Sequence, residues 1–449
     1  MSVKVTYDPD CKMLFEGLEC DCPCEHSLPT QDIYVGEHLI ARVPEYIRRR
    51  GLGENCVLVC DTNTYAVAGR DVYEALTGAG FKVELCRIER EGEVQPDELS
   101  VGQLLLTIQP ETQFLVAVGS GTITDTTRVN AARTGLPFVS IGTAPSMDGY
   151  TSVVAPLLLK GLKIHRNGPC PEIIVCDLGV LKTAPMKLVR SGVGDVLGKY
   201  IAIADWKIGG IINDEPYCHT CGDIVIEAVD KLLANVDEIN NKTEKGMRVL
   251  IEALLLAGIT IMIVGHTRAV ASIEHNVTHY IDMKMLERHG YAPSHGATVG
   301  VCTLLCYPMF KRFAAEGTPR VDVSRLEGTD VEARKAWMRK TWGESSGATI
   351  MAENPGDFLD AEERRRRASR AIERYADIKA VIDEMPSYEK IREAMTRLGA
   401  PLTPDDLRID ADIISVGMHC GKDYRTRYSL FKTLDELGLL QEYLKDYKI

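Results

Sequence analysis

Short apolar runs that alternate with helical stretches constrain the fold of this chain more than any other feature. CVLVC at 56–60 and FLVAV at 114–118 are apolar throughout, and strand-like runs also occupy 82–85, 138–141 and 173–176. Strands that are apolar on both faces are typical of parallel sheets covered by helices on each side. The alternation therefore predicts a Rossmann-like α/β domain in the first part of the chain.

Beyond about residue 186 the pattern changes to long segments of helical periodicity with few β-branched runs. The predicted fold class is thus two-domain, with an α/β Rossmann-like parallel-sheet domain over 31–185 followed by an all-α domain over 186–449. Residues 1–30 carry Pro23 and Pro29 among several cysteines. We expect this segment to be an irregular extension before the first regular element.

Charge and composition exclude several classes of partner. The 449 residues include 64 acidic and 52 basic side chains, which gives a net charge of −12 and no general attraction to nucleic acid or to an anionic membrane surface. The most apolar stretch, Val249 to Val264, is interrupted by Glu252 and predicts a buried helix rather than a membrane span. The 14 cysteines are too sparse for a disulfide scaffold and the chain opens on polar residues, so we expect a cytoplasmic protein.

Four potential metal ligands lie close together near the start of the chain, namely Cys20, Cys22, Cys24 and His26. The CxCxC spacing is not the usual zinc pattern and no second CxxC pair follows it. Metal binding is one interpretation, and reduced thiols that hold no metal are the favoured one.

A glycine-containing loop follows the 114–118 run and precedes a helical stretch. It reads GSGTITD, from Gly119 through Gly121 and Thr122 to Asp125. Glycines let a backbone approach a phosphate closely, and a helix start offers unpaired N–H groups, so the loop can cradle a pyrophosphate. The GxGxxG fingerprint is incomplete because its third glycine is Thr124, and a plain tight turn is the alternative.

Two further segments lie where strands of an α/β sheet end. Asp61 ends the 56–60 strand and can accept hydrogen bonds from a ribose, which favours NAD over NADP, or it can cap a helix. The loop over 143–152 gathers hydroxyls, a carboxylate and a glycine, either at a ligand site or in simple turns.

The metal candidates lie in the helical half of the chain. His275 and His279 are four residues apart in a helical segment and share one face, so that both can meet one ion or form an ordinary core pair. His295 begins another helical run, and Asp195 is a lone acid among small and apolar residues at a predicted helix start. One carboxylate with two or three imidazoles can hold a divalent ion and leave a position open.

With these residues assembled, the chain resembles sn-glycerol-1-phosphate dehydrogenase, a family related to the iron-containing alcohol dehydrogenases and dehydroquinate synthase. The resemblance extends from about residue 30 to the end. Its most specific stretches are GSGTITD, TAPSMDGYTS at 143–152, GVGDVLGKYIAIADWK at 192–207, EHNVTH at 274–279 and PSHG at 293–296.

The resemblance implies NAD or NADP and one divalent metal ion, zinc, nickel or iron. By motif, the expected metal ligands are Asp195, His275 and His295. His279 and Asp148 match positions that contact the substrate, and together with Asp195 they are the expected catalytic residues. The expected nucleotide contacts are Asp61, Gly119, Gly121, Thr122, Asp125, Thr143, Ser146 and Ser152.

The implied reaction interconverts sn-glycerol 1-phosphate and dihydroxyacetone phosphate, a step of phospholipid metabolism. Lys199, Arg268 and Lys163 are candidates for the substrate phosphate. A related polyol dehydrogenase acting on glycerol and a non-catalytic nucleotide-binding relative are the alternatives. The expected partners are a small phosphorylated polyol and further copies of the chain in a dimer or larger homo-oligomer, without nucleic acid or membrane.

Overall fold

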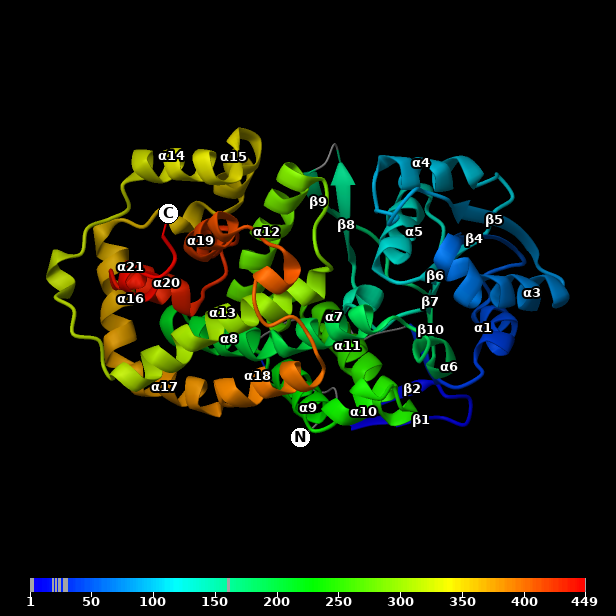
Figure 1. Ribbon diagram of the computed structural model, residues 1–449, viewed down its shortest axis with the longest axis horizontal. Helices are drawn as coiled ribbons and strands as arrows, with labels where there is room; N and C mark the ends of the chain where they lie inside the picture. Colours follow the sequence, from blue (N-terminus) through cyan, green and yellow to red (C-terminus); the bar gives the residue numbers. More distant parts are fainter. Residues whose placement is uncertain are drawn as a thin grey trace. The chain divides into compact units, whose positions relative to one another are not determined.

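The computed structural model describes residues 4–17, 20, 22, 26, 31–159 and 162–448 (Figure 1). By compactness the chain divides into two units. The first contains Met1–Cys20, Glu25–Val196 and Asp223–His266, and the second contains Asp21–Cys24, Leu197–Gly222 and Thr267–Ile449. The predicted domains 31–185 and 186–449 were defined by their secondary structure, not by compactness. This division therefore does not test them, and they remain predictions.

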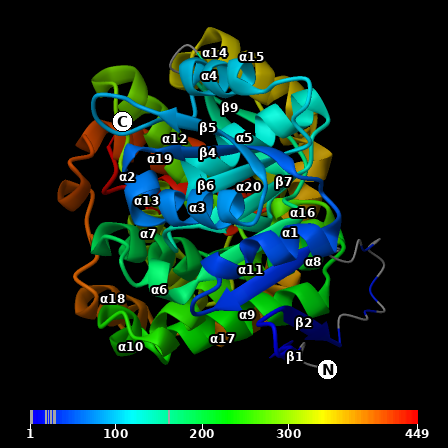
Figure 2. The same cartoon turned by 90° about the vertical axis from the view of Figure 1, so that its right-hand side faces the viewer.

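A six-stranded parallel sheet forms the centre of the first unit, and Figure 2 shows β4, β5, β6 and β7 side by side. The strands follow the order β3 (Asp32–Gly36), β10 (Ile173–Asp177), β7 (Phe138–Gly142), β6 (Phe114–Gly119), β4 (Asn55–Asp61) and β5 (Lys82–Ile88). All five predicted strands are therefore confirmed. The strand β3 was not predicted; it is a five-residue edge strand that is buried along its whole length.

Helices cover both faces of this sheet, as the apolar runs predict. On one face, α1 (Val43–Arg50) and α3 (Arg70–Gly78) pack against alternate strand residues such as Leu58 and Val116. On the other face, α4 (Glu98–Thr107) and α5 (Gly121–Thr134) pack against the intervening residues such as Val57 and Leu115. The predicted α/β fold of this part of the chain is confirmed.

The connections of the sheet reverse direction between β4 and β6. From β4 the chain continues outward to the edge strand β5, then returns across β4 to β6 and proceeds to β7 on the other side. In open parallel sheets, ligands bind beyond the carboxyl ends of the two strands at such a switch point. Here those ends are Asp61 and Gly119.

Two hairpins were not expected. β1 (Lys4–Tyr7) and β2 (Met13–Glu16) pair antiparallel, so the prediction of an irregular segment is wrong for this part of residues 1–30. The turn between them is fixed by the Asp8 carboxylate, which accepts hydrogen bonds from the N–H groups of Asp10 and Lys12. The second hairpin joins β8 (Val154–Leu159) to β9 (Leu162–Asn167).

Every regular element described after β10 is helical, as predicted for 186–449. The elements are α6 (Leu178–Leu181), α7 (Met186–Leu197), α8 (Lys199–Asn213), α9 (His219–Leu233), α10 (Val236–Asn240), α11 (Glu244–Val264), α12 (Ile273–His289), α13 (His295–Glu316), α14 (Val331–Trp342), α15 (Glu344–Glu353), α16 (Ala361–Glu373), α17 (Tyr375–Glu384), α18 (Tyr388–Arg397), α19 (Ala411–Cys420), α20 (Leu430–Glu436) and α21 (Leu440–Tyr443). Short single-turn helices complete the connections.

The apolar stretch over 249–264 lies in α11, which is long and apolar enough to cross a membrane. Its apolar window is 89% buried inside the structure, as in the core helix of a soluble protein. The prediction of a buried helix is confirmed.

Candidate nucleotide and metal sites

The predicted phosphate loop lies at the carboxyl end of β6. Gly119 ends the strand, and α5 begins at Gly121 without a hydrogen bond from the Ser120 side chain to its first turn. A Cβ at Gly119 would lie 2.6 Å from Ile123, so only glycine allows this close approach of strand and helix. A Cβ at Gly121 would meet nothing closer than Met147 at 3.5 Å. The start of this 14-residue helix is therefore suited to an anionic group.

Asp61 lies at the same edge of the sheet. The pairing of Val59 with Ala117 places Asp61 and Gly119 two residues further along neighbouring parallel strands. The Asp61 carboxylate accepts the N–H of Thr64 at 2.7 Å, and the Thr64 hydroxyl in turn accepts the N–H of Asp61 at 2.9 Å. Asp61 therefore caps a helix in the structure, and the cap uses one oxygen of its carboxylate.

Asp125 and Thr122 differ in their surroundings. Asp125 forms an ion pair with buried Arg128 at 2.6 Å, and burial raises the pKa of Asp125 to about 7 although Arg128 lowers it. Arg128 also donates to the carbonyl oxygen of Gly149 at 2.7 Å. Asp125 therefore ties α5 to the 143–152 loop, while Thr122 is half-buried near the helix start.

The 143–152 loop lies against the phosphate loop. The N–H of Thr143 donates to the carbonyl oxygen of Gly119 at 3.1 Å, and the hydroxyl oxygens of Ser146 and Ser120 are 2.6 Å apart. Ser152 instead accepts the N–H of Val154 within its own turn. The structure thus brings Thr143 and Ser146, but not the Ser152 hydroxyl, into hydrogen-bond contact with the phosphate-loop region.

Asp195 lies in the last turn of α7, so its predicted place at a helix start is wrong. Gly192 also lies inside this helix, and only glycine fits there because a Cβ would overlap the carbonyl oxygen of Pro145. The Asp195 side chain is 1% exposed and accepts the N–H of Asp148 at 3.1 Å. Two residues predicted to share a site are therefore in direct contact.

The three predicted histidines gather in the second unit. His275 and His279 lie one turn apart on α12, and His295 begins α13. The ring centroid of His295 is 5.5 Å from that of His275 and 5.3 Å from that of His279. Rings at this separation can direct nitrogen atoms toward one ion.

Two carboxylates that the sequence analysis missed fix the orientation of these rings. Nδ1 of His275 lies 2.6 Å from Oε1 of Glu274, and Nδ1 of His295 lies 3.1 Å from Oδ2 of Asp282. Glu274 and Asp282 are almost fully buried. A carboxylate that holds one ring nitrogen leaves Nε2 for a metal, which is the usual arrangement around metal-bound histidines. These residues therefore fit a divalent ion.

The structure also offers a second ligand grouping. Potential ligand atoms of His279, Asp282 and His295 all lie within 4.8 Å of one another. Asp282 is then either a ligand itself or the orienting partner of His295.

Comparison with known proteins identifies the family. Residues 34–185 match the family model described as iron-containing alcohol dehydrogenase. A glycerol-1-phosphate dehydrogenase [NAD(P)+] from Halalkalibacterium halodurans is 38% identical over 315 residues, which cover 68% of this chain and 79% of the relative. The chain belongs to the glycerol-1-phosphate dehydrogenase family. A second member of the family, from Bacillus velezensis, is 35% identical over 91% of this chain and 92% of its own length.

Solved structures support the fold of this glycerol-1-phosphate dehydrogenase family member. A glycerol dehydrogenase from Schizosaccharomyces pombe superimposes with a TM-score of 0.60 and covers 96% of this chain and 93% of its own, at 14% identity. At this identity the likeness concerns the fold alone. The predicted two-part architecture, α/β followed by helical, is the one these structures share.

Proposed function

We propose that this chain is a metal-dependent oxidoreductase that interconverts sn-glycerol 1-phosphate and dihydroxyacetone phosphate, with NAD or NADP as the hydride carrier. The observation that carries the proposal is the set of three clustered histidines, two of them oriented by buried carboxylates, in a chain 38% identical to a glycerol-1-phosphate dehydrogenase.

The nucleotide is assigned to the carboxyl ends of β4 and β6. Gly119, Gly121 and Thr122 present the start of α5 to the pyrophosphate, with Thr143 and Ser146 beside them. Asp61 accepts hydrogen bonds from the ribose hydroxyls with the carboxylate oxygen that does not cap the helix. Asp125 acts through Arg128 by fixing the neighbouring loop, and Ser152 supports that loop from its far end.

The ligands proposed for the divalent ion are Asp195, His275 and His295, with Glu274 and Asp282 orienting the two imidazoles. When bound, such an ion acts as a Lewis acid that lowers the pKa of the substrate alcohol or polarises the corresponding carbonyl. The amide of Asp148 holds one oxygen of Asp195, so this residue positions a ligand whatever its side chain does.

His279 is proposed to exchange the proton of the substrate hydroxyl. Its ring lies 5.3 Å from that of His295 and 5.2 Å from that of Tyr424 and is 8% exposed. A neutral imidazole beside the ion can accept the alcohol proton and pass it to solvent, and in the reverse direction it returns a proton to the carbonyl oxygen.

The substrate phosphate is assigned to Arg427 and Arg425. Arg268, considered from the sequence, is committed to the fold, since it makes two bonds to Glu215 at 2.8 and 2.9 Å. Arg427 makes no ion pair with a described acid but donates to the Thr267 hydroxyl; burial, then the positive charges of Arg425 and Arg268, lower its pKa to about 9. A half-buried guanidinium beside like charges favours an anion, and Tyr424, which directly precedes Arg425 in the chain, contacts His279.

The assay that tests the proposed function measures oxidation of NADH or NADPH with dihydroxyacetone phosphate on purified protein, alongside elemental analysis. Chelation should abolish turnover and a divalent ion should restore it. His275→Ala should lose the metal, whereas His279→Ala should keep the metal and lose rate. Full activity of metal-free protein, or equal metal loss in both variants, contradicts the assignment. Glycerol offered in the oxidation direction tests the unphosphorylated alternative.

We assign the chain to a homo-oligomer, a dimer or larger, in the cytoplasm. Sedimentation of the purified protein tests the first assignment, because a monomer at assay concentration contradicts it.

A further inference from the structure

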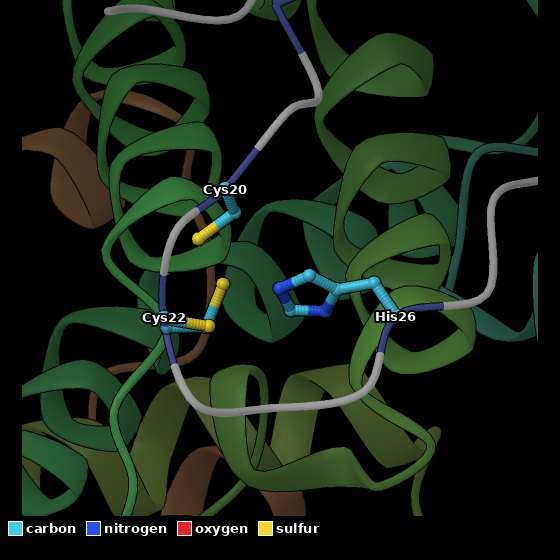
Figure 3. Close-up of side chains that lie close together, drawn as sticks. Cys20, Cys22 and His26 are labelled. Carbon is cyan, nitrogen blue, oxygen red and sulfur yellow. The ribbon is translucent and has the colours of Figure 1, made fainter.

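Three potential metal ligands near the start of the chain point toward one another. Figure 3 shows the sulfur atoms of Cys20 and Cys22 near each other, with the imidazole ring of His26 directed toward them. Ligand atoms of these residues and of Cys218 all lie within 4.8 Å of one another. We propose that Cys20, Cys22, His26 and Cys218 form a structural zinc site, separate from the ion of the proposed reaction. Cys24 lies outside the described residues.

The separations fit a tetrahedral ion. With Zn–S distances of about 2.3 Å, sulfur atoms in a tetrahedral site are roughly 3.8 Å apart. Atoms already within 4.8 Å need to move by no more than about 1 Å to reach this arrangement. A set of three cysteines and one histidine is one of the common structural zinc sets, and it fills all four positions.

His26 is held in an orientation suited to this role. Its Nδ1 lies 3.4 Å from the carbonyl oxygen of Ile263 in α11. A histidine that donates Nδ1–H to a carbonyl presents Nε2 as its metal-binding atom. In Figure 3 the ring edge that bears the second nitrogen faces the two cysteines.

Cys218 is the fourth member of the cluster. It directly precedes α9, is 0% exposed, and its sulfur accepts the N–H of Cys221 at 3.4 Å. The start of a helix stabilises a thiolate through its N–H groups and its dipole. A fully buried thiolate still requires a cation, which a zinc ion supplies.

The chemistry of the set also separates the two sites. Three thiolates and an imidazole favour a soft or borderline ion such as zinc, whereas Asp195, His275 and His295 contain no sulfur. The described residues Cys20, Cys22 and His26 lie in no helix or strand. We therefore assign the ion a role in fixing this part of the chain rather than in the reaction.

Cobalt substitution tests the site on the reduced, full-length protein. Cobalt bound to thiolates gives a sulfur-to-cobalt charge-transfer band that a site of carboxylate and imidazole cannot give. We expect this band in the wild type and in His275→Ala. The band should be lost in Cys22→Ser. It should be lost in the same way in Cys20→Ser and in Cys218→Ser. Because Cys218 is buried and its variant can misfold, Cys22→Ser, at a half-buried position, is the deciding variant.

Cys11→Ser is the matched control, since Cys11 is a half-buried cysteine of the same segment outside the cluster. Zinc content should fall by one equivalent in Cys22→Ser and stay unchanged in Cys11→Ser, with reductase activity retained in both. The proposal is overturned if the reduced wild type shows no thiolate band, or if Cys22→Ser keeps it. A disulfide among these cysteines in protein purified with reductant would also overturn it. His275→Ala should be inactive but should keep the band. The test of this site is therefore independent of the proposed reaction.

Discussion

Oε1 of Glu274 lies 2.6 Å from Nδ1 of its neighbour in sequence, His275, and both side chains are buried in the second unit. Glu274 also accepts the N–H of Ser272 at 3.1 Å, so its carboxylate is fixed from a second direction. The ring orientation of His275 is therefore set by the protein before any ion binds, which is how histidine ligands are commonly pre-organised.

Glu274→Gln should weaken metal binding without removing a ligand. The amide oxygen can still accept both hydrogen bonds, but it lacks the negative charge that makes the imidazole a stronger ligand, so we expect roughly 10- to 100-fold weaker affinity. Competition with a chelator measures it. Glu287→Gln, at an exposed position of the same helix, is the control and should leave affinity unchanged. Unaltered affinity in Glu274→Gln would count against the orienting role.

Variants of Asp195 and Asp282 distinguish the two possible ligand sets. If Asp195 is the ligand and Asp282 orients His295, Asp195→Asn should lose the metal, while Asp282→Asn should keep it with roughly 10- to 100-fold weaker affinity. Elemental analysis and chelator competition on both proteins check this. The opposite outcome would assign the ion to His279, Asp282 and His295.

Asp61→Asn should shift the cofactor preference toward NADP without loss of stability. Asparagine caps a helix about as well as aspartate, but it removes the charge that repels a 2′-phosphate. The ratio of kcat/KM for NADH and NADPH measures the effect. Asp97→Asn changes a helix cap at α4 and serves as the control, because its ratio should stay constant. An unchanged ratio in Asp61→Asn excludes a role for its charge.

Arg427→Met should impair use of the phosphorylated substrate. Loss of one hydrogen bond to a charged group costs about 1.5–3 kcal/mol, or roughly 10- to 100-fold in kcat/KM for dihydroxyacetone phosphate. Metal content should remain unchanged. Arg392→Met, at an exposed position on α18, is the control. Normal kinetics in Arg427→Met would leave the phosphate to other residues.

Asp205 should make the protein less stable as the pH rises. Burial raises the pKa of this carboxyl from 3.8 to about 7, although the hydroxyl of Ser272 and the charge of Arg268 lower it. The folded state therefore binds more protons than the unfolded chain between these two values, and the free energy of unfolding falls as the pH rises through this window. Denaturant titrations from pH 4 to 8 measure the slope.

Asp205→Asn should flatten that slope, because the amide does not titrate. Its hydrogen-bond contacts with Leu430 and Ser272 change as well, so only the pH dependence, not the absolute stability, tests the prediction. Asp223→Asn, at an exposed position, should keep the slope of the wild type.

Much of the sheet could be predicted because its strands are continuous apolar runs. Leu58 and Val57 face opposite sides of β4, and both are fully buried. Because both faces of the strand are covered, every position in it can be apolar, and this makes the strand visible in the sequence. The β1–β2 hairpin has no such signal. Its strands have four residues each, and Leu14 is 41% exposed, so neither length nor alternation identifies them.

The site residues likewise fall into those that the sequence identifies and those that only the structure shows. The spacing of His275 and His279 places them on one helix face, and this follows from sequence alone. Glu274 and Asp282 look like ordinary helix-surface acids until the structure shows that they are buried. Cys218 lies far along the chain from Cys20, so its approach depends on tertiary packing that no local spacing reveals.

The loop over 143–152 and α7 are fastened at three points: Gly192 packs on the carbonyl of Pro145, Ser191 donates to Ser146, and the amide of Asp148 donates to Asp195. A dinucleotide that stiffens this loop also stiffens the carboxylate assigned to the ion. By thermodynamic linkage, the dinucleotide then raises the affinity for the ion, and the ion raises the affinity for the dinucleotide by the same factor. Retention of the ion during purification should accordingly improve when the dinucleotide is included in the buffers.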